Sequence, residues 1–140
     1  MTTENEVRQN FFIVRESDTI IATQATQKLA REIGFNLAMQ SMIATAVSEL
    51  GTNIIKYAGR GYILIGKIRR MKQEGIEIIA EDSGPGLPDI AGALTDSFST
   101  GESLGLGLPG VKRLMDEFLI DSNEGCGTKI VAKKWKPLKC

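Results

Sequence analysis

The chain has 140 residues, 42% of them hydrophobic, which is enough for one compact domain with a core and too few for two domains. The 17 basic and 17 acidic residues give a formal net charge of zero, so binding to nucleic acid or to an anionic membrane through bulk charge is not expected. The sequence contains no histidine. A histidine base, a histidine metal ligand and a phosphohistidine acceptor are therefore excluded within this chain.

The N-terminus is polar and acidic, and no apolar run approaches the roughly 18 residues of a membrane helix. We therefore expect a cytoplasmic protein. Cys126 and Cys140 are the only cysteines, and the second is the last residue. We expect neither a disulfide framework nor a cysteine zinc site.

The first half of the chain predicts one strand and two helices. Residues 7–14 have the composition of a strand. Asp18 and Thr19 precede an apolar pattern that Gly34 ends, which predicts a helix over 20–33. The longest helix is predicted from Asn36 to Tyr57, because its apolar residues recur at helical intervals and form one stripe.

The second half predicts four strands, a long loop and a helix. Strands are expected over 62–69 and 76–81, joined by a polar turn over 70–75, and over 119–122 and 129–135. Residues 89–107 have little periodicity and many small side chains, typical of a loop that covers a ligand or of a disordered insertion. Helical spacing returns over 109–118. The predicted fold class is an α/β (α+β) two-layer sandwich, a mostly antiparallel sheet with helices on one face.

The segment over 81–88 places Asp82 at the end of a predicted strand, followed by Gly84 and Gly86. An acid in this position can recognise the edge of a base. The two glycines let the backbone turn with positive φ and approach a ligand without a Cβ in the way. A strand that leaves the sheet through a plain Pro/Gly turn would have the same sequence.

Glu49 and Asn53 are four residues apart on the longest predicted helix and are therefore neighbours on its surface. In a functional site, the Asn53 oxygen could coordinate Mg²⁺ between phosphates, and the Glu49 carboxylate could orient or deprotonate a hydroxyl. The spacing alone favours a solvated flank.

Two glycine-containing segments lie in the C-terminal part. Gly105 and Gly107 precede the predicted helix over 109–118, where backbone N–H groups and the positive helix end could bind an anion. No Gly-Lys-Ser/Thr follows and no βαβ unit surrounds them, which excludes a Walker loop and a dinucleotide fingerprint. Gly127 and Thr128 form either a plain turn or a site in which the Thr128 hydroxyl joins Asp82 in holding an adenine, directly or through water.

These four signals follow the order of the N, G1, G2 and G3 boxes, and the chain resembles the GHKL ATPase/kinase superfamily over nearly its whole length. Within it the chain is most similar to the RsbT-type serine/threonine-protein kinases, switch proteins of bacterial stress signalling. The resemblance rests on SELGTNIIKYAG (48–59), IAEDSGPG (79–86), FST (98–100) and GLPGVKRLMDEF (107–118), of which the last is the most specific.

The resemblance implies a single ATPase domain over 1–140 with a Bergerat-type site for ATP and Mg²⁺. Asn53 would ligate Mg²⁺, Glu49 would be the candidate catalytic base, and Asp82 would bind the adenine amino group. The loop over 89–107 would be the ATP lid. Two glycine pairs would complete the site, the first shaping the adenine floor and the second meeting the phosphates: Gly84 with Gly86, and Gly105 with Gly107.

The resemblance also implies partners. The substrates would be serine or threonine residues of STAS-domain scaffold proteins, RsbS-like and RsbR-like, assembled as a stressosome. The released kinase would bind and activate a PP2C-type phosphatase of the RsbU kind. Neither nucleic acid nor a membrane is an expected partner.

Two other functions fit the same residues. One is a non-catalytic, anti-sigma-factor-like binding module, in which nucleotide only stabilises a binding surface. The other is the ATP-binding half of a histidine kinase, which the missing dimerisation helices and the missing histidine disfavour. Phosphoryl transfer needs mainly positioning and charge neutralisation, so a protein without histidine can still be a kinase.

Overall fold

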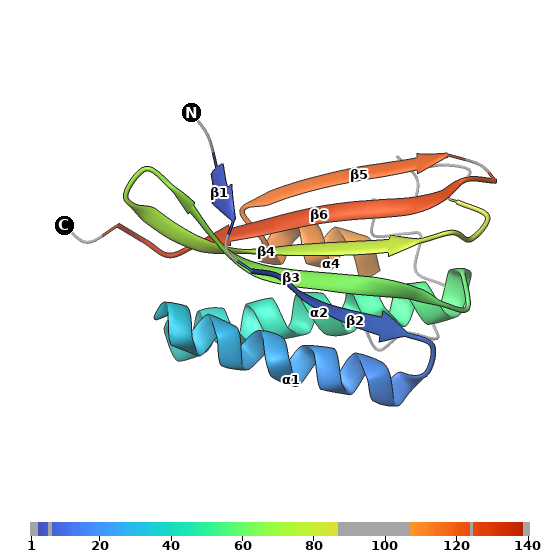
Figure 1. The fold of residues 1–140 in the computed structure, drawn as a ribbon, viewed down its shortest axis with the longest axis horizontal. Helices are drawn as coiled ribbons and strands as arrows, with labels where there is room; N and C mark the ends of the chain where they lie inside the picture. The colour runs from blue at the N-terminus through green and yellow to red at the C-terminus, as the bar shows by residue number, and fades with distance from the viewer. Residues whose placement is uncertain (1–2, 6, 87–106, 124, 139–140) are drawn as a thin grey trace.

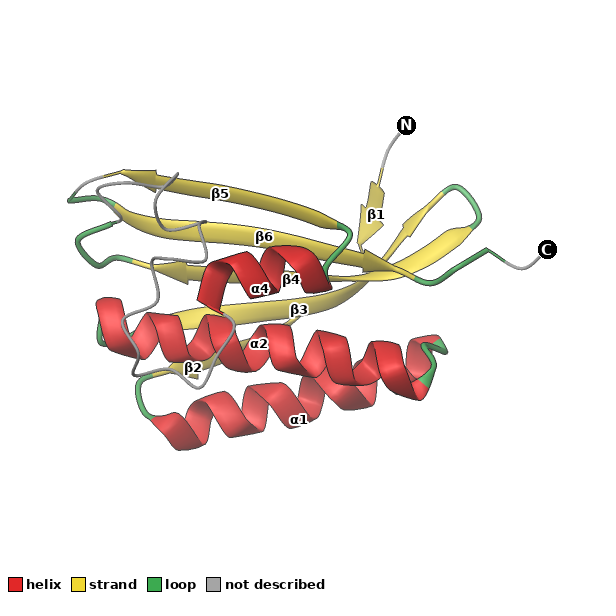
Figure 2. Cartoon of the chain, turned by 180° about the vertical axis from the view of Figure 1, so that it is seen from behind, coloured by secondary structure: helices red, strands yellow, loops and turns green. Residues whose placement is uncertain are grey.

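The computed structural model describes residues 3–5, 7–86, 107–123 and 125–138. They form a six-stranded antiparallel sheet with helices packed on one of its faces (Figures 1 and 2). The strands are β1 (Thr3–Asn5), β2 (Gln9–Ile13), β3 (Gly61–Arg70), β4 (Gln73–Asp82), β5 (Glu117–Asn123) and β6 (Gly127–Trp135). The helices are α1 (Glu16–Ile33), α2 (Leu37–Tyr57) and α4 (Gly107–Leu114). The predicted fold class is confirmed.

The sheet order is β1-β3-β4-β6-β5, and β2 also pairs with β3. β1 opposes the end of β3 and β2 opposes its beginning, so the two short strands follow one another along the same sheet edge. Sequence analysis predicted β2 but not β1, whose three residues are polar. Such a short segment has no alternating apolar pattern that could reveal a strand.

Helix α1 begins at Glu16, four residues before the predicted start, because Asp18 lies inside the first turn and not ahead of it. The Asp18 carboxylate accepts hydrogen bonds of 3.0 Å from the backbone N–H groups of Val14 and of Arg15. These bonds, the Val14 bond first, lower the pKa of Asp18. Such a carboxylate satisfies N–H groups that have no partner within the helix.

Helix α2 follows the predicted boundaries closely. The Asn36 side chain caps it by accepting a 2.8 Å hydrogen bond from the backbone N–H of Met39. Four members of the predicted stripe are at most 3% exposed and form part of the core: Ile43, Val47, Leu50 and Ile54. Tyr57, the last member of that stripe, is 38% exposed because it lies at the end of the helix.

The predicted helix over 109–118 is wrong at its end. Helix α4 stops at Leu114, and Phe118 lies in β5 opposite Ala132. Two hydrogen bonds to β6 hold the chain where α4 ends and β5 begins. The Lys134 ammonium donates to the Leu114 carbonyl oxygen at 2.7 Å, and the Asp116 carboxylate accepts from the Trp135 backbone N–H at 2.7 Å. These partners come from a distant strand, so the local helical spacing could not reveal them.

The predicted polar turn over 70–75 is also wrong in length. Strands β3 and β4 pair as far as Arg70 and Gln73, which leaves a two-residue turn. Met71 occupies that turn with a φ of +58°. Polar side chains in this hairpin reflect exposure at the tip and not the absence of strand structure.

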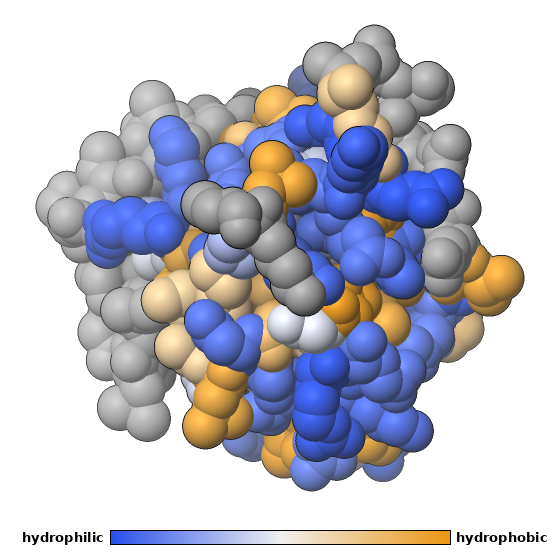
Figure 3. Space-filling model, turned by 90° about the vertical axis from the view of Figure 1, so that its left-hand side faces the viewer, coloured by the Kyte–Doolittle hydropathy of each residue, from blue (hydrophilic) through white to orange (hydrophobic). Residues whose placement is uncertain are grey.

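The end of the molecule that carries the β3–β4 hairpin is mostly hydrophilic over its described residues, with hydrophobic residues in smaller groups between them (Figure 3). Among the described helices, none is long and apolar enough to cross a membrane.

Candidate functional site

A polar row crosses the sheet where β4 ends. Its members are successive cross-strand partners: Gly61 of β3, Asp82 of β4, Thr128 of β6 and Ser122 of β5. Directly opposed residues share a face of the sheet. Two residues further along each strand, the same face carries the core residues Ile63, Ala80, Ile130 and Ile120. The polar row therefore borders the core on the face that the helices cover.

The turn after β4 holds Asp82 in place. The backbone N–H of Gly84 donates to Asp82 Oδ1 at 2.9 Å. A Cβ on Gly84 would lie 2.6 Å from the Cβ of Ala58, so only glycine lets this turn lie against the end of α2. Of the two glycines predicted to adopt positive φ, Gly86 does so at +77°, whereas Gly84 does not and is required for its close contact.

The start of β6 approaches Asp82 equally closely. Gly127 has a φ of +90°, and a Cβ there would lie 2.1 Å from the Asp82 carbonyl oxygen. The next residue, Thr128, is half-buried and lies opposite Asp82. Gly84 and Gly127 thus let the backbone of two turns lie close to Asp82.

Sequence analysis missed Ser122. Its Oγ lies 2.7 Å from Thr128 Oγ1 and 3.3 Å from the Gly127 carbonyl oxygen, to which it can donate. The sequence shows a hydroxyl in the predicted strand over 119–122, but only the β5–β6 register places it opposite Thr128.

Glu49 and Asn53 lie on one flank of α2 and are half-buried, so this flank is not the fully solvated one that the spacing favoured. Gly51 marks the other flank, since a Cβ there would lie 2.5 Å from Thr19 Cγ2 of α1. At about 100° per residue, Glu49 and Asn53 face away from α1, toward the side of α2 on which α4 packs (Figure 2).

One carboxylate oxygen of Glu49 is in an unusual environment. Its Oε2 is buried and has no hydrogen-bond partner among the described residues. A buried carboxylate oxygen is costly unless a partner satisfies it, so such an atom marks a position where a ligand or a bound group would supply that partner.

Gly107 begins α4 with a φ of +61°, and Leu108 and Val111 of the same helix are buried in the core. Helix α4 is thus anchored in the core, and it packs against α2. Gly105 and almost all of the predicted lid over 89–107 lie outside the described residues.

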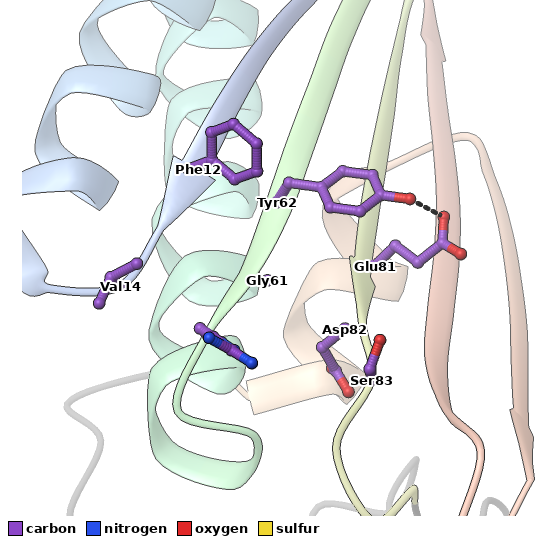
Figure 4. Close-up of a pocket in the computed structure, with 8 residues that line it drawn as sticks. Phe12, Val14, Gly61, Tyr62, Glu81, Asp82 and Ser83 are labelled. Carbon is purple, nitrogen blue, oxygen red and sulfur yellow. Dashed lines mark hydrogen bonds between the residues drawn. The ribbon is translucent and has the colours of Figure 1, made fainter.

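A hollow of about 380 Å³ lies near the same end of the sheet (Figure 4). Its lining includes Phe12, Tyr62 and Glu81, which are cross-strand partners on the face opposite the helices. The Tyr62 hydroxyl donates to Glu81 Oε2 at 2.7 Å, and this bond raises the pKa of Tyr62. Glu49, Asn53 and Thr128 do not line this hollow. Asp82 and Gly61 do line it, so the hollow shares Asp82 with the site that the sequence predicted and adjoins that site at the end of β4.

Comparison with known proteins identifies the family. The family model described as the histidine kinase-like ATPase domain matches residues 15–134. The chain belongs to this family. It is 50% identical over 123 residues, 88% of this chain and 92% of the relative, to the serine/threonine-protein kinase RsbT of Bacillus subtilis (strain 168). It is therefore an RsbT-type serine/threonine-protein kinase by family, as the sequence motifs indicated.

Two further relatives widen the comparison. The anti-sigma F factor of Clostridium novyi (strain NT) is 34% identical over 97 residues, which are 66% of this chain and 68% of that protein. The solved structure of the mycobacterial sensor histidine kinase MprB has a TM-score of 0.53 and 18% identity, with 94% of this chain and 100% of that chain covered. The second likeness shows the shared fold alone, and it confirms the ATPase-type sandwich.

Proposed function

We propose that this protein binds Mg-ATP between the polar row, α2 and α4, and transfers the γ-phosphoryl group to a serine or threonine of a STAS-domain scaffold protein. The observation that carries the proposal is the buried, unpartnered Glu49 Oε2 on the flank of α2 that faces away from α1. The 50% identity to a serine/threonine-protein kinase supports phosphoryl transfer as the reaction.

Asp82 is the proposed adenine ligand. A carboxylate only accepts hydrogen bonds when ionised, and the exocyclic amino group of adenine only donates them. The Gly84 N–H fixes one carboxylate oxygen, which orients the other. Gly84 and Gly86 would form the floor beneath the base, and Thr128 would provide a second polar contact.

Asn53 is the proposed Mg²⁺ ligand. The described residues contain no group of three or more His, Cys, Asp or Glu side chains that could hold a metal. Mg²⁺ is commonly held by one or two protein oxygens together with substrate phosphates, and an amide oxygen on the same flank as Glu49 suits that arrangement. When bound, Mg²⁺ would neutralise phosphate charge, and the N–H groups near Gly107, with Gly105, would contact the phosphates.

Glu49 is the proposed catalytic base. In the transfer, the acceptor hydroxyl oxygen bonds to the γ-phosphorus, the bond between that phosphorus and the leaving oxygen of ADP breaks, and the hydroxyl proton passes to Glu49. A carboxylate oxygen that is desolvated and unpartnered is suited to accept or orient that proton.

We further propose that the protein switches between two kinds of partner, RsbS-like or RsbR-like scaffold proteins as substrates and an RsbU-like PP2C-type phosphatase that it activates. The similarity to both a kinase and an anti-sigma factor supports exchange between protein partners. The anti-sigma factor relative also favours a second candidate, a binding module in which ATP stabilises a partner-binding surface without transfer.

Incubation with labelled Mg-ATP and a purified STAS-domain scaffold separates these candidates. We expect label on the scaffold with the wild-type protein. Glu49→Gln should lower transfer by about 100-fold or more while ATP affinity and scaffold binding persist, whereas Asp82→Asn should lose ATP binding. The matched controls are Glu32→Gln and Asp121→Asn, both at exposed positions. Binding of ATP and scaffold without transfer by the wild type would establish the binding module instead.

A further inference from the structure

The polar row ends in two hydroxyl groups that contact one another. Ser122 Oγ and Thr128 Oγ1 are 2.7 Å apart, which is the usual length of an O–H···O hydrogen bond. One of the two hydroxyls must therefore donate to the other. The direction of that bond decides whether Thr128 offers a proton or a lone pair to anything bound beside Asp82.

The Gly127 carbonyl oxygen favours one direction of the hydrogen bond between Ser122 and Thr128. Ser122 Oγ also lies 3.3 Å from the Gly127 carbonyl oxygen, which can only accept. If Ser122 donates its single proton to this carbonyl, then Thr128 must donate to Ser122, and each contact is a hydrogen bond. In the reverse direction the proton of Ser122 is used on Thr128, and the carbonyl contact is lost. Of these two contacts, both are hydrogen bonds only in the direction from Thr128 to Ser122 to Gly127, and this direction is favoured.

In this arrangement Thr128 presents only lone pairs toward the nucleotide site. Asp82 lies directly opposite Thr128 on the same face, and such pairs have Cβ atoms about 4.5–5.5 Å apart. The site therefore offers two acceptors side by side. An exocyclic amino group has two diverging N–H donors and matches this pair, whereas a 6-oxo purine would place a third acceptor against them.

We propose that Ser122 is a positioning residue for base selectivity: by taking the Thr128 proton, it makes the site prefer a 6-amino purine over a 6-oxo purine. This inference rests on the proposed function, because it takes the ATP base to lie beside Asp82. Without the Ser122 hydroxyl, the Thr128 hydroxyl is released to rotate and can donate to a 6-oxo group. Selectivity then falls even though every side chain in direct contact with the base is unchanged.

The test compares dissociation constants for Mg-ATP and Mg-ITP, whose bases differ in having a 6-amino or a 6-oxo group. We expect the wild type to prefer ATP, and Ser122→Ala to lower the ratio of the ITP constant to the ATP constant by about tenfold, the size of one misdirected hydrogen bond. Ser122→Thr keeps a hydroxyl on the strand and should restore the wild-type ratio. Ser41→Ala, at an exposed position of α2, is the matched control and should leave the ratio unchanged.

A double substitution separates positioning from a general structural effect. Thr128→Val removes the hydroxyl through which Ser122 acts, so adding Ser122→Ala to it should not change the ratio further. An unchanged ratio in Ser122→Ala, or an equal change in the Thr128→Val background, would overturn this inference while the nucleotide site stands. Absence of ATP binding by the wild type, or unchanged ATP affinity in Asp82→Asn, would overturn the proposed function as well.

Discussion

The backbone of Asp82 lies so close to the start of β6 that the residue opposite its carbonyl oxygen must be a glycine. Gly127 combines a φ of +90° with a Cβ position that would overlap the Asp82 carbonyl oxygen. Gly125, in the same turn, has a φ of +82° but open space around its Cβ position. The two glycines share one backbone requirement and differ in packing, so they form a matched pair.

Substitution of this pair should separate the two effects. Gly125→Ala should cost about 1–2 kcal/mol of unfolding free energy, because alanine in the left-handed region is strained. Gly127→Ala should cost about 3 kcal/mol or more, because the overlap also displaces β6 from β4. Urea denaturation measures the two losses of unfolding free energy. Titration with ATP measures the nucleotide affinity, which only Gly127→Ala should lower. Equal losses in the two variants would show that the close approach to Asp82 is unimportant.

Glu117 gives the fold a dependence on acid. It accepts hydrogen bonds from Arg70, at 3.0 Å, and from the indole N–H of Trp135. The Arg70 bond first, and then the Trp135 bond, lowers the pKa of Glu117 below its ordinary value of 4.5. A lowered folded-state pKa stabilises the protein above pH 4.5, and this stabilisation is lost as the pH falls through the folded-state value.

Glu117→Gln should therefore make the unfolding free energy fall less steeply as the pH is lowered. We expect the variant to lose less unfolding free energy than the wild type between about pH 6 and pH 3.5, since glutamine does not titrate. Fluorescence of Trp135, the single tryptophan of the chain, follows the unfolding. Adding Arg70→Met to Glu117→Gln should not reduce this pH dependence of the unfolding free energy further. If the unfolding free energy of Glu117→Gln falls with decreasing pH as steeply as that of the wild type, the acid sensitivity belongs to other carboxylates.

At the scale of elements, sequence patterns predicted those helix boundaries that depend on residues close in sequence. The stripe of α2 and its Asn36 cap depend on residues close in sequence, and the prediction of this helix is confirmed. The end of α4 depends on Lys134 and Trp135 of another strand, and there the prediction was wrong. The same distinction applies to the proposed site: Asp82 and Thr128 were predicted from their glycine neighbours, whereas the position of Ser122 beside Thr128 depends on the strand register.

The contact between α1 and α2 is set by Gly51 and Thr19. A Cβ on Gly51 would lie 2.5 Å from Thr19 Cγ2 and 2.6 Å from Thr19 Oγ1. Thr19 is buried, and its hydroxyl has no hydrogen-bond partner among the described residues. A glycine in a helix interior is unfavourable by about 1 kcal/mol relative to alanine, so this position keeps close packing at a cost in helix propensity.

Gly51→Ala should therefore destabilise the protein by about 1–2 kcal/mol despite the better helix propensity of alanine, because overpacking outweighs that gain. Thr19→Ala makes room for the new methyl group, and the double variant should recover most of the lost stability. A double-mutant cycle by urea denaturation gives the coupling energy. Additive effects of the two substitutions would mean that the helices separate without strain.

At the scale of the whole molecule, the proposed site joins the two layers of the sandwich. Asp82 and Thr128 belong to the sheet, whereas Glu49 and Asn53 belong to a helix that packs on it. A ligand that contacts both layers binds only when they are assembled, so its binding free energy adds to the free energy of unfolding. The hollow beside Tyr62 shares Gly61 and Asp82 with the polar row, but none of its lining residues belongs to a helix, so it does not bridge the layers.

Mg-ATP at 100 times its dissociation constant should therefore raise the unfolding free energy by about 2.7 kcal/mol, a rise in melting temperature of roughly 8 °C. Asp82→Asn should abolish this rise, because the sheet loses its contact to the base. Tyr62→Phe removes the hydroxyl that donates to Glu81 on the opposite face and leaves the side chains of the polar row unchanged, so it should keep the full rise. Loss of the ATP-dependent rise in Tyr62→Phe would place the nucleotide in the hollow on the open face of the sheet, whatever the effect of Asp82→Asn, because Asp82 lines that hollow as well.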